Sequence, residues 1–271
     1  DPMVIRDDPA DDGTRPRGSR KDRFLQQVER TICSEADHIW WFTEDALNYA
    51  KLRNPKLEDR GFVVLPGAEP PVCHHYHEYS DTLNLCHFGS LTNDRSLAPV
   101  LNSLETFFVN HPKAKNVIRI HTYGSDIDEA AKAVLEQLNL PEIIVNHGRL
   151  ESDPLTGKSG RERVIEKMYE ADVLLLLHGD YEWCAEYIPS KLYEYFWAQR
   201  PVVAVTNRNR FLDELLLKHN SYVCHTHDKA SILQTFENLW RDWQRSSLKA
   251  FEGEPVSVND AVSQILTRVE H

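Results

Sequence analysis

The chain has 271 residues, of which 41% are hydrophobic and 27% charged, which is ordinary for a soluble globular protein that buries a core. At ~100 to 200 residues per domain, this length fits one large domain or two small ones. The formal net charge of −11 argues against a general nucleic-acid binder, which needs surplus Lys and Arg to neutralise phosphates.

Membrane and metal signals are weak throughout the sequence. No apolar run approaches the ~18 residues of a membrane span, and no signal-type segment opens the chain, so a cytoplasmic location is expected. The five cysteines include no CxxC pair, and this spacing is more typical of reduced thiols than of disulfides. The run Cys73-His-His-Tyr-His77 contains ligand types, but no second cluster stands at partner spacing. No metal is therefore expected.

The first 80 residues predict no complete domain. Residues 1–20 are polar and lack an initiator Met, which indicates a flexible leading segment or a chain cut from a longer one. An amphipathic helix is expected over 21–36. A βαβ-like fragment follows, namely a strand at 38–42, a helix over 44–52 capped by Thr43, and a strand at 62–65. The Pro-rich run 66–71 then marks a domain boundary.

From residue 81 the sequence alternates between apolar strands and amphipathic helices. Strands are predicted at 83–88, 117–121, 143–145, 173–177, 202–205 and 222–224. Helices are predicted at 95–109, 127–138, 160–169, 189–198, 209–218 and 229–243, with a last amphipathic stretch at 257–270 whose apolar face needs a surface to cover it. The alternation, with the uninterrupted apolar strand Val173 to Leu177, predicts an α/β fold with a doubly wound parallel sheet.

In such a sheet a ligand lies beyond the carboxyl ends of the strands, where the strand order reverses. Nearly all the loops at those ends contain a glycine, which lets backbone approach a ligand closely. The sequence has no GxGxxG after its first strand, no P-loop and no GxSxG elbow. Dinucleotide oxidoreductase, P-loop and α/β-hydrolase interpretations therefore lose their main support.

The stretch from Glu186 to Val205 carries the most chemistry. Pro189 suits the first position of a helix, because it has no N–H to leave unsatisfied. The amides of Ser190, Lys191 and Leu192 would then be free, and with the helix dipole they predict an anion site.

Glu186 lies just before this helix start and Glu194 about one turn inside it. A diphosphate with a hydroxyl-rich sugar on each side would fit amides flanked by two carboxylates. On spacing alone, the favoured explanation is that Glu186 is a loop charge and Glu194 an exposed helix charge, so the surrounding motifs have to decide.

Those motifs resemble the C-terminal half of retaining glycosyltransferases of the GT-B fold, and their order and spacing agree over residues 83–243. The matching segments are Gly89-Ser-Leu, Arg119 to Gly124, Val145 to Gly148, Tyr169 to Leu176, the Glu186-x7-Glu194 signature and Arg200 to Val203. The segments around 35–42 and 64–67 resemble the end of the N-terminal lobe and the hinge.

The resemblance implies a role for each matching residue. Glu186 would be the catalytic carboxylate that holds the donor sugar, and Glu194 would bind the ribose. The diphosphate would lie against Gly89, Ser90, Pro189, Ser190, Lys191 and Leu192, with Arg95 as a cation and Arg149 beside the base. For Arg95, Arg149 and Lys191, a solvated side chain is the alternative. No cofactor or metal is implied beyond the donor, a UDP- or GDP-linked sugar.

The resemblance also implies how the chain is divided into domains. Residues 1–80 would form a flexible leading segment, a remnant of the N-terminal lobe and the hinge. Residues 81–250 would form a Rossmann-like nucleotide-sugar-binding domain, and residues 251–271 a helix that returns to the N-terminal lobe. Most of the N-terminal lobe would come from another part of the same polypeptide or from a separate chain. The sequence differs from the family pattern at two places. Ile188-Pro189-Ser190 replaces the usual glycine, and the Arg-x4-Lys pair after the first strand is incomplete. The identity of the donor is therefore left undecided.

The expected function is transfer of a sugar to an acceptor hydroxyl, with this chain supplying the donor lobe. One alternative is a nucleotide-sugar epimerase of the same fold. The other is a non-catalytic nucleotide-sugar-binding or interaction lobe, in which Trp40, Trp41 and Phe42 would cover a partner rather than belong to an ordinary core.

Overall fold

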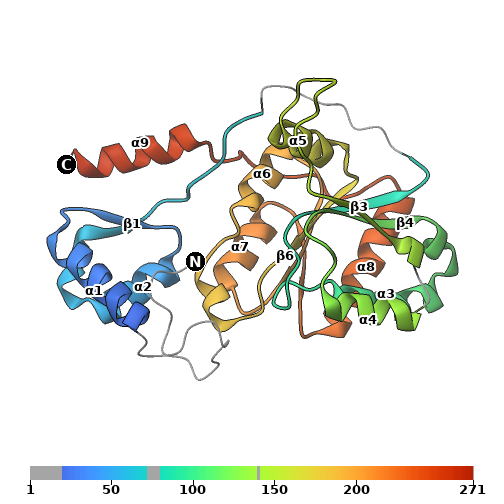
Figure 1. Cartoon of the computed structure of the whole chain (residues 1–271), viewed down its shortest axis with the longest axis horizontal. Helices are drawn as coiled ribbons and strands as arrows, with labels where there is room; N and C mark the ends of the chain where they lie inside the picture. The colour runs from blue at the N-terminus through green and yellow to red at the C-terminus, as the bar shows by residue number, and fades with distance from the viewer. Residues whose placement is uncertain (1–19, 72–79, 139–140, 271) are drawn as a thin grey trace.

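The computed structural model describes residues 20–71, 80–138 and 141–270. The leading segment and Cys73 to His77 therefore lie outside the described residues. Six parallel strands form one sheet in the order β5-β4-β3-β6-β7-β8 (Figure 1). They are β3 (Leu83–Gly89), β4 (Ile118–Gly124), β5 (Ile144–Gly148), β6 (Val173–Leu177), β7 (Val202–Thr206) and β8 (Tyr222–His225). The predicted doubly wound parallel sheet is confirmed.

Helices cover both faces of this sheet. One face carries α3 (Ala98–Asn110), α4 (Glu129–Leu138) and α8 (Lys229–Gln244). The other carries α5 (Gly160–Glu170), α6 (Lys191–Ala198) and α7 (Arg210–Lys218). The chain leaves β3 toward one face and β6 toward the other, although the two strands are neighbours in the sheet. The strand order therefore reverses between β3 and β6, where a doubly wound sheet leaves a crevice.

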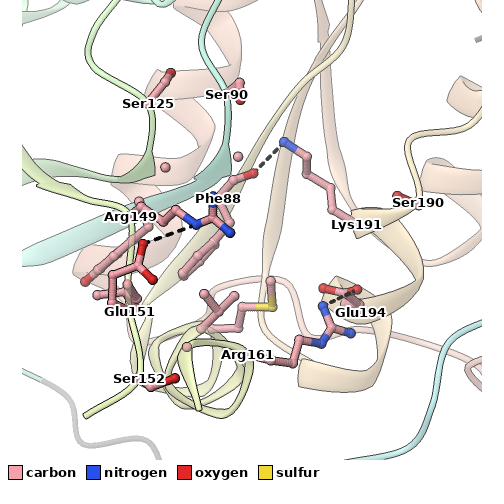
Figure 2. Close-up of a pocket in the computed structure, with 17 residues that line it drawn as sticks. Phe88, Ser90, Ser125, Arg149, Glu151, Ser152, Arg161, Ser190, Lys191 and Glu194 are labelled. Atoms are coloured by element: carbon pink, nitrogen blue, oxygen red, sulfur yellow. Dashed lines mark hydrogen bonds and ion pairs between the residues drawn. The ribbon is translucent and has the colours of Figure 1, made fainter. Parts of the chain in front are cut away.

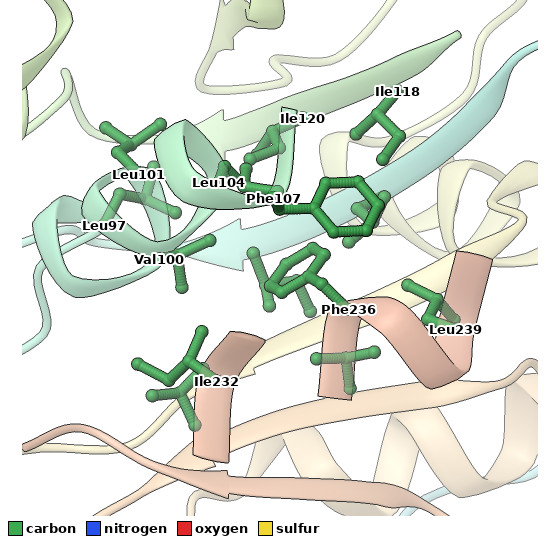
Figure 3. Close-up of a cluster of buried hydrophobic side chains, with 14 of the residues drawn as sticks. Leu97, Val100, Leu101, Leu104, Phe107, Ile118, Ile120, Ile232, Phe236 and Leu239 are labelled. Atoms are coloured by element: carbon green, nitrogen blue, oxygen red, sulfur yellow. The ribbon is translucent and has the colours of Figure 1, made fainter. Parts of the chain in front are cut away.

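The larger core lies between the sheet and the α3/α8 layer (Figure 3). Phe107 from α3 and Phe236 from α8 are both at most 1% exposed, and their ring centroids are 6.3 Å apart. Leu104 and Ile120 are fully buried beside them. These contacts fix α3 and α8 against the strands whose ends form the candidate site.

Four helices of the sheet domain begin one to three residues later than the sequence predicts. The helix expected from residue 95 begins at Ala98, with Pro99 in its first turn, because Thr92 and Arg95 instead close a tight turn in which the Arg95 amide donates to the Thr92 carbonyl at 2.9 Å. The helix expected from Pro189 begins at Lys191. The other predicted elements of the sheet domain are confirmed, with ends shifted by a few residues.

A smaller unit precedes the sheet. It contains α1 (Arg20–Glu35), β1 (Ile39–Trp41), α2 (Glu44–Arg53), the 3₁₀ segment Pro55–Arg60 and β2 (Gly61–Val63), and β1 pairs with β2 in parallel. Thr43 caps α2 as predicted, because its hydroxyl accepts from the Ala46 amide at 3.2 Å. The same hydroxyl donates to the Glu186 carbonyl, so one side chain links this unit to the sheet domain.

The last helix, α9 (Val258–Val269), leaves the six-stranded unit and runs above β1 in the view of Figure 1. Its apolar residues Val262, Leu266 and Val269 are each about half exposed. Trp40 and Phe42, at and just after β1, are exposed to a similar extent, whereas Trp41 packs against the small core of this unit. None of the described helices combines the length and the apolar character that crossing a membrane requires.

We expect Phe107→Ala to lower the free energy of unfolding by about 3 to 5 kcal/mol, because it removes a fully buried ring from the larger core. Val109→Ala in the same helix is the control, since that side chain is 76% exposed, and its effect should stay within about 0.5 kcal/mol. Urea unfolding measures both. Equal effects of the two substitutions would contradict the packing described for α3.

Candidate functional site

A cavity of about 820 Å³ lies at the carboxyl ends of β3, β4 and β5, bounded on its far side by the first turns of α5 and α6 (Figure 2). Its walls combine backbone of the strand ends with charged and polar side chains. The lining residues are Phe88, Gly89, Ser90, Tyr123, Gly124, Ser125, Arg149, Leu150, Glu151, Ser152, Gly160, Arg161, Val164, Met168, Ser190, Lys191 and Glu194.

Two glycines allow the strand ends to come together here. Gly124 has a φ of +143°, and a Cβ built on it would lie 2.4 Å from the Gly89 carbonyl oxygen. Gly89 has a φ of +118°, and a Cβ there would lie 2.7 Å from the amine nitrogen of Lys191. Backbone conformations in this region strongly favour glycine. The space that a side chain of residue 89 would fill is thus taken by a cation.

Lys191 is the basic group at the centre of the cavity wall. Its amine donates a hydrogen bond to the Phe88 carbonyl at the end of β3 (Figure 2). Burial, together with the positive charge of Arg95, lowers the pKa of Lys191 to about 8, although Glu194 opposes this shift. The amine is therefore a desolvated cation that still carries its proton at neutral pH.

The start of α6 differs from the sequence prediction in its hydrogen bonding. Ser190 is the N-cap and Pro189 precedes it, so Pro189 does not occupy the first helical position. The Leu192 amide donates to the Pro189 carbonyl at 2.9 Å, and its side chain is fully buried, so Leu192 offers no free amide. Among the described residues, no acceptor is recorded for the amides of Ser190 and Lys191. Two free amides remain where three were predicted.

Glu194 lines the cavity, and its carboxylate is held by Arg161 from the first turn of α5 at 2.8 Å (Figure 2). The Glu194 side chain is 21% exposed and that of Arg161 is 57% exposed. Sequence reasoning did not select Arg161, because an arginine in the first turn of an exposed helix looks like a solvated charge. Only the packing of α5 beside α6 reveals it.

Glu186 and Arg95 are not among the residues that line this cavity. Glu186 ends a short 3₁₀ segment, Glu182–Glu186, and is 4% exposed. Arg95 lies 3.7 Å from Asp94, and its buried Nε has no hydrogen-bond acceptor among the described residues. The structure thus brings six predicted donor residues together, namely Gly89, Ser90, Arg149, Ser190, Lys191 and Glu194, and leaves Glu186, Arg95, Pro189 and Leu192 outside the lining.

Aromatic rings form one side of the cavity. The rings of Phe88 and Tyr123 stack with centroids 4.8 Å apart, and His147 stacks on Tyr123 at 4.4 Å. Arg149, just beyond β5, is 84% exposed and lies 3.4 Å from Glu151. Phe88 and Tyr123 are only 4% and 7% exposed, so this stack is largely buried. The exposed cationic side chain of Arg149 lies across the cavity from Lys191 (Figure 2).

No protein-family model matches the chain, and no curated protein matches its sequence. Solved structures do match its fold. A structure of S. aureus TarM, in complex with fondaparinux, alpha-GlcNAc-glycerol and UDP, aligns over 89% of this chain and 43% of its own, with 11% identity and a TM-score of 0.57. A Burkholderia vietnamiensis alpha,alpha-trehalose-phosphate synthase (UDP-forming) aligns over 81% and 55%, with 9% identity and a TM-score of 0.57.

WaaG, a glycosyltransferase involved in lipopolysaccharide biosynthesis, aligns over 81% of this chain and 58% of its own, with 14% identity and a TM-score of 0.54. The shared architecture is the GT-B fold of glycosyltransferases, and the six-stranded sheet of this chain is one Rossmann-like lobe of it. At these identities the similarity establishes the fold. The chain spans about half the length of the structures it matches.

We expect Gly89→Ala to displace the amine of Lys191, since the new methyl group would lie within 2.7 Å of it at a flexible chain end. The pKa of Lys191 should then rise from about 8 toward the ordinary lysine value as the amine reaches solvent. NMR titration of ¹³Cε-labelled lysine measures this. Gly148→Ala is the control, because Gly148 also has a positive φ but no atom near its Cβ position. A Lys191 pKa that is unchanged in Gly89→Ala would contradict this geometry.

Proposed function

We propose that this chain is the donor-binding lobe of a glycosyltransferase, which moves a sugar from a nucleotide diphosphosugar to an acceptor hydroxyl with retention of anomeric configuration. The observation that carries the proposal is the 820 Å³ cavity where the strand order reverses. The buried amine of Lys191, the start of α6 at Ser190 and the carboxylate of Glu194 all line it. The fold similarity to glycosyltransferases supports it.

The diphosphate fits the wall formed by Gly89, Ser190 and Lys191. Two free amides at the start of α6 point their hydrogens at an anion, and the helix dipole adds partial positive charge there. The side chain of Lys191 extends from this helix start to the Phe88 carbonyl at the end of β3, where its amine adds a cation. Because Gly89 has no side chain, the Lys191 amine fits against the strand end, where a phosphate would meet it. These donors are fixed before the ligand arrives.

The nucleoside fits the remainder of the cavity. The Glu194 carboxylate, one turn into α6, suits the paired hydroxyls of a ribose. Arg161 holds that carboxylate at 2.8 Å and keeps it oriented. Arg149 and the ring of Tyr123 line the end where a base would lie. UDP is the first nucleotide to test, because the TarM complex contains it.

In the proposed reaction, the bond between the anomeric carbon and the diphosphate oxygen breaks, and a bond to the acceptor oxygen forms on the same face. The proton of the acceptor hydroxyl passes to the departing diphosphate. Negative charge accumulates on the departing diphosphate. Preorganised amides and the cation of Lys191 oppose that charge, which is the main contribution this lobe makes to catalysis. Glu186 is proposed to hold the donor sugar. Glu186 is buried, so this role requires the segment Glu182–Glu186 to move and expose the Glu186 carboxylate when the donor binds.

The acceptor is proposed to bind an N-terminal lobe that lies beyond the described residues or on another chain. The half-exposed apolar side chains of α9, together with Trp40 and Phe42, support this proposal, because a contiguous lobe would cover them. Binding of donor with little transfer is therefore expected of this chain by itself.

We expect UDP or GDP to raise the thermal unfolding temperature of the chain, because a ligand at 100 times its Kd adds about 2.7 kcal/mol to the folded state. Glu194→Gln should weaken that response at least tenfold in affinity. Glu214→Gln is the matched control, since Glu214 also pairs with an arginine, Arg210 at 2.7 Å, but lies on α7 away from the cavity. Absence of any response to nucleoside diphosphates, or equal loss in both variants, would reject the donor site.

Nucleotide affinity should also fall as pH rises through about 8. The pKa of Lys191 is depressed in the folded protein, so its charge is complete below pH 8 and is lost above it. A bound diphosphate raises that pKa, and the affinity should therefore drop by up to about tenfold per pH unit above 8. Lys191→Met should bind weakly at all pH values with no such decline. Calorimetric titration with UDP between pH 7 and 9.5 measures this, and a pH-independent affinity in the unmodified chain would contradict the role of Lys191.

A further inference from the structure

Two side chains of opposite charge lie together at the end of the cavity where a base is proposed to bind. Arg149 and Glu151 both line the cavity, and Arg149 Nε lies 3.4 Å from Glu151 Oε1. Figure 2 shows this pair across the cavity from Lys191 and Glu194. A nucleotide with its diphosphate at Lys191 and its ribose at Glu194 would therefore present the edge of its base to Arg149 and Glu151.

The backbone that carries this pair is held in place by α5. Arg163 of α5 donates a hydrogen bond to the Glu151 carbonyl at 2.6 Å. A Cβ built on Gly160, the first residue of α5, would lie 2.2 Å from the Leu150 carbonyl oxygen, so the helix start packs directly against this segment. The two charged side chains can reorient on a ligand, whereas the backbone from which they extend is fixed.

Both side chains are accessible to a ligand. The side chain of Arg149 is 84% exposed and that of Glu151 is 76% exposed. Within the described part of the chain, the only polar contact recorded for either charged group is the one between them. At 3.4 Å this contact is longer than a charge-assisted hydrogen bond, and exposed ion pairs contribute little free energy. A ligand can therefore share or replace it at small cost.

A guanidinium beside a carboxylate presents hydrogen-bond donors next to acceptors. Guanine has the complementary edge, because its O6 accepts while its N1–H and N2–H groups point the same way and can both donate to one carboxylate. Uracil has a single N3–H group between two carbonyl oxygens. A carboxylate that accepts from this N3–H brings its second oxygen against a carbonyl oxygen, which repels it. The pair therefore favours guanine over uracil, and these are the two bases expected for the donor.

The apolar part of the lining suits a base with two rings. Leu150, between the two charged residues in sequence, lines the cavity together with Val164 of α5. Both side chains are partly exposed and offer apolar surface that a planar ring can cover. A purine covers more of this surface than a pyrimidine does, and burial of apolar area is favourable. Apolar contact and hydrogen bonding thus favour the same base.

We propose that Arg149 and Glu151 select guanine, so that the donor is a GDP-linked sugar. The Glu151 carboxylate accepts from N1–H and N2–H of the base, and the Arg149 guanidinium donates to O6. A base that lacks these groups leaves the polar side chains without partners, and this is how a hydrogen-bonding site rejects an analogue. The inference rests on the proposed nucleotide site and adds a choice of base to it.

Calorimetric titration of the chain with GDP, UDP and inosine diphosphate tests the choice of base. We expect GDP to bind more tightly than UDP by about tenfold or more, as for other bidentate contacts to a base. Inosine diphosphate differs from GDP only in lacking the 2-amino group. It should bind more weakly than GDP, because one of the two hydrogen bonds to Glu151 is lost.

Glu151→Gln tests the carboxylate itself. The amide of this variant offers one acceptor and one donor side by side, a pattern that matches the N3–H and carbonyl edge of uracil. We expect the GDP affinity to fall about tenfold, the UDP affinity to stay unchanged or rise, and the difference between GDP and inosine diphosphate to disappear. Glu214→Gln is the matched control, because Glu214 is also exposed and paired with an arginine, but lies away from the cavity. It should leave all three affinities unchanged.

The nucleotide site and the choice of base fail in different ways. If none of the three nucleotides binds, the proposed nucleotide site is rejected, and the selection of guanine with it. If the nucleotides bind but UDP binds as tightly as GDP, the site stands and the selection of guanine is overturned. Equal weakening of all three nucleotides by Glu151→Gln would also overturn it, because a carboxylate that reads the base must distinguish between bases.

Discussion

The reversal of strand order between β3 and β6 governs the chemistry of this chain. These two strands are neighbours, yet the chain leaves β3 for α3 on one face and β6 for α6 on the other. No crossover connection can cover the space above both carboxyl ends, because the connections diverge there. A cavity of about 820 Å³ lies at this edge of the sheet on the α5/α6 side, and a smaller one of about 90 Å³ lies on the α3/α8 side.

The electrostatics of the larger cavity follow from this geometry. The end of β3 has a free carbonyl at Phe88, and the start of α6 projects Lys191 toward it. Because residue 89 is glycine, the amine fits against the strand end and loses much of its hydration. A desolvated cation interacts strongly with a phosphate, since little water has to be removed when the ligand arrives.

The smaller N-terminal unit is physically connected to this machinery. Thr43 completes the first turn of α2 and also binds the carbonyl of Glu186, so the position of the segment Glu182–Glu186 depends on the α1/α2 unit. The apolar side chains of α9, together with Trp40 and Phe42, remain exposed at that end of the molecule. A chain that spans about half the length of its structural neighbours would leave such surface uncovered.

The sequence by itself determined the sheet, because strand burial and helix amphipathicity are local patterns that Val173 to Leu177 or the α8 residues Ile232, Phe236 and Leu239 display directly. It also determined the glycines at strand ends and the helix that carries Glu194. Arg161 required the tertiary structure, because its contact with Glu194 joins two helices that are distant in sequence and leaves no spacing signal. The burial of Glu186 and the hydrogen bond from the Leu192 amide to the Pro189 carbonyl were likewise decided by packing. Local patterns encode which residues are apolar and where the chain turns, whereas hydrogen-bond partners and solvent access depend on segments brought together from distant parts of the chain.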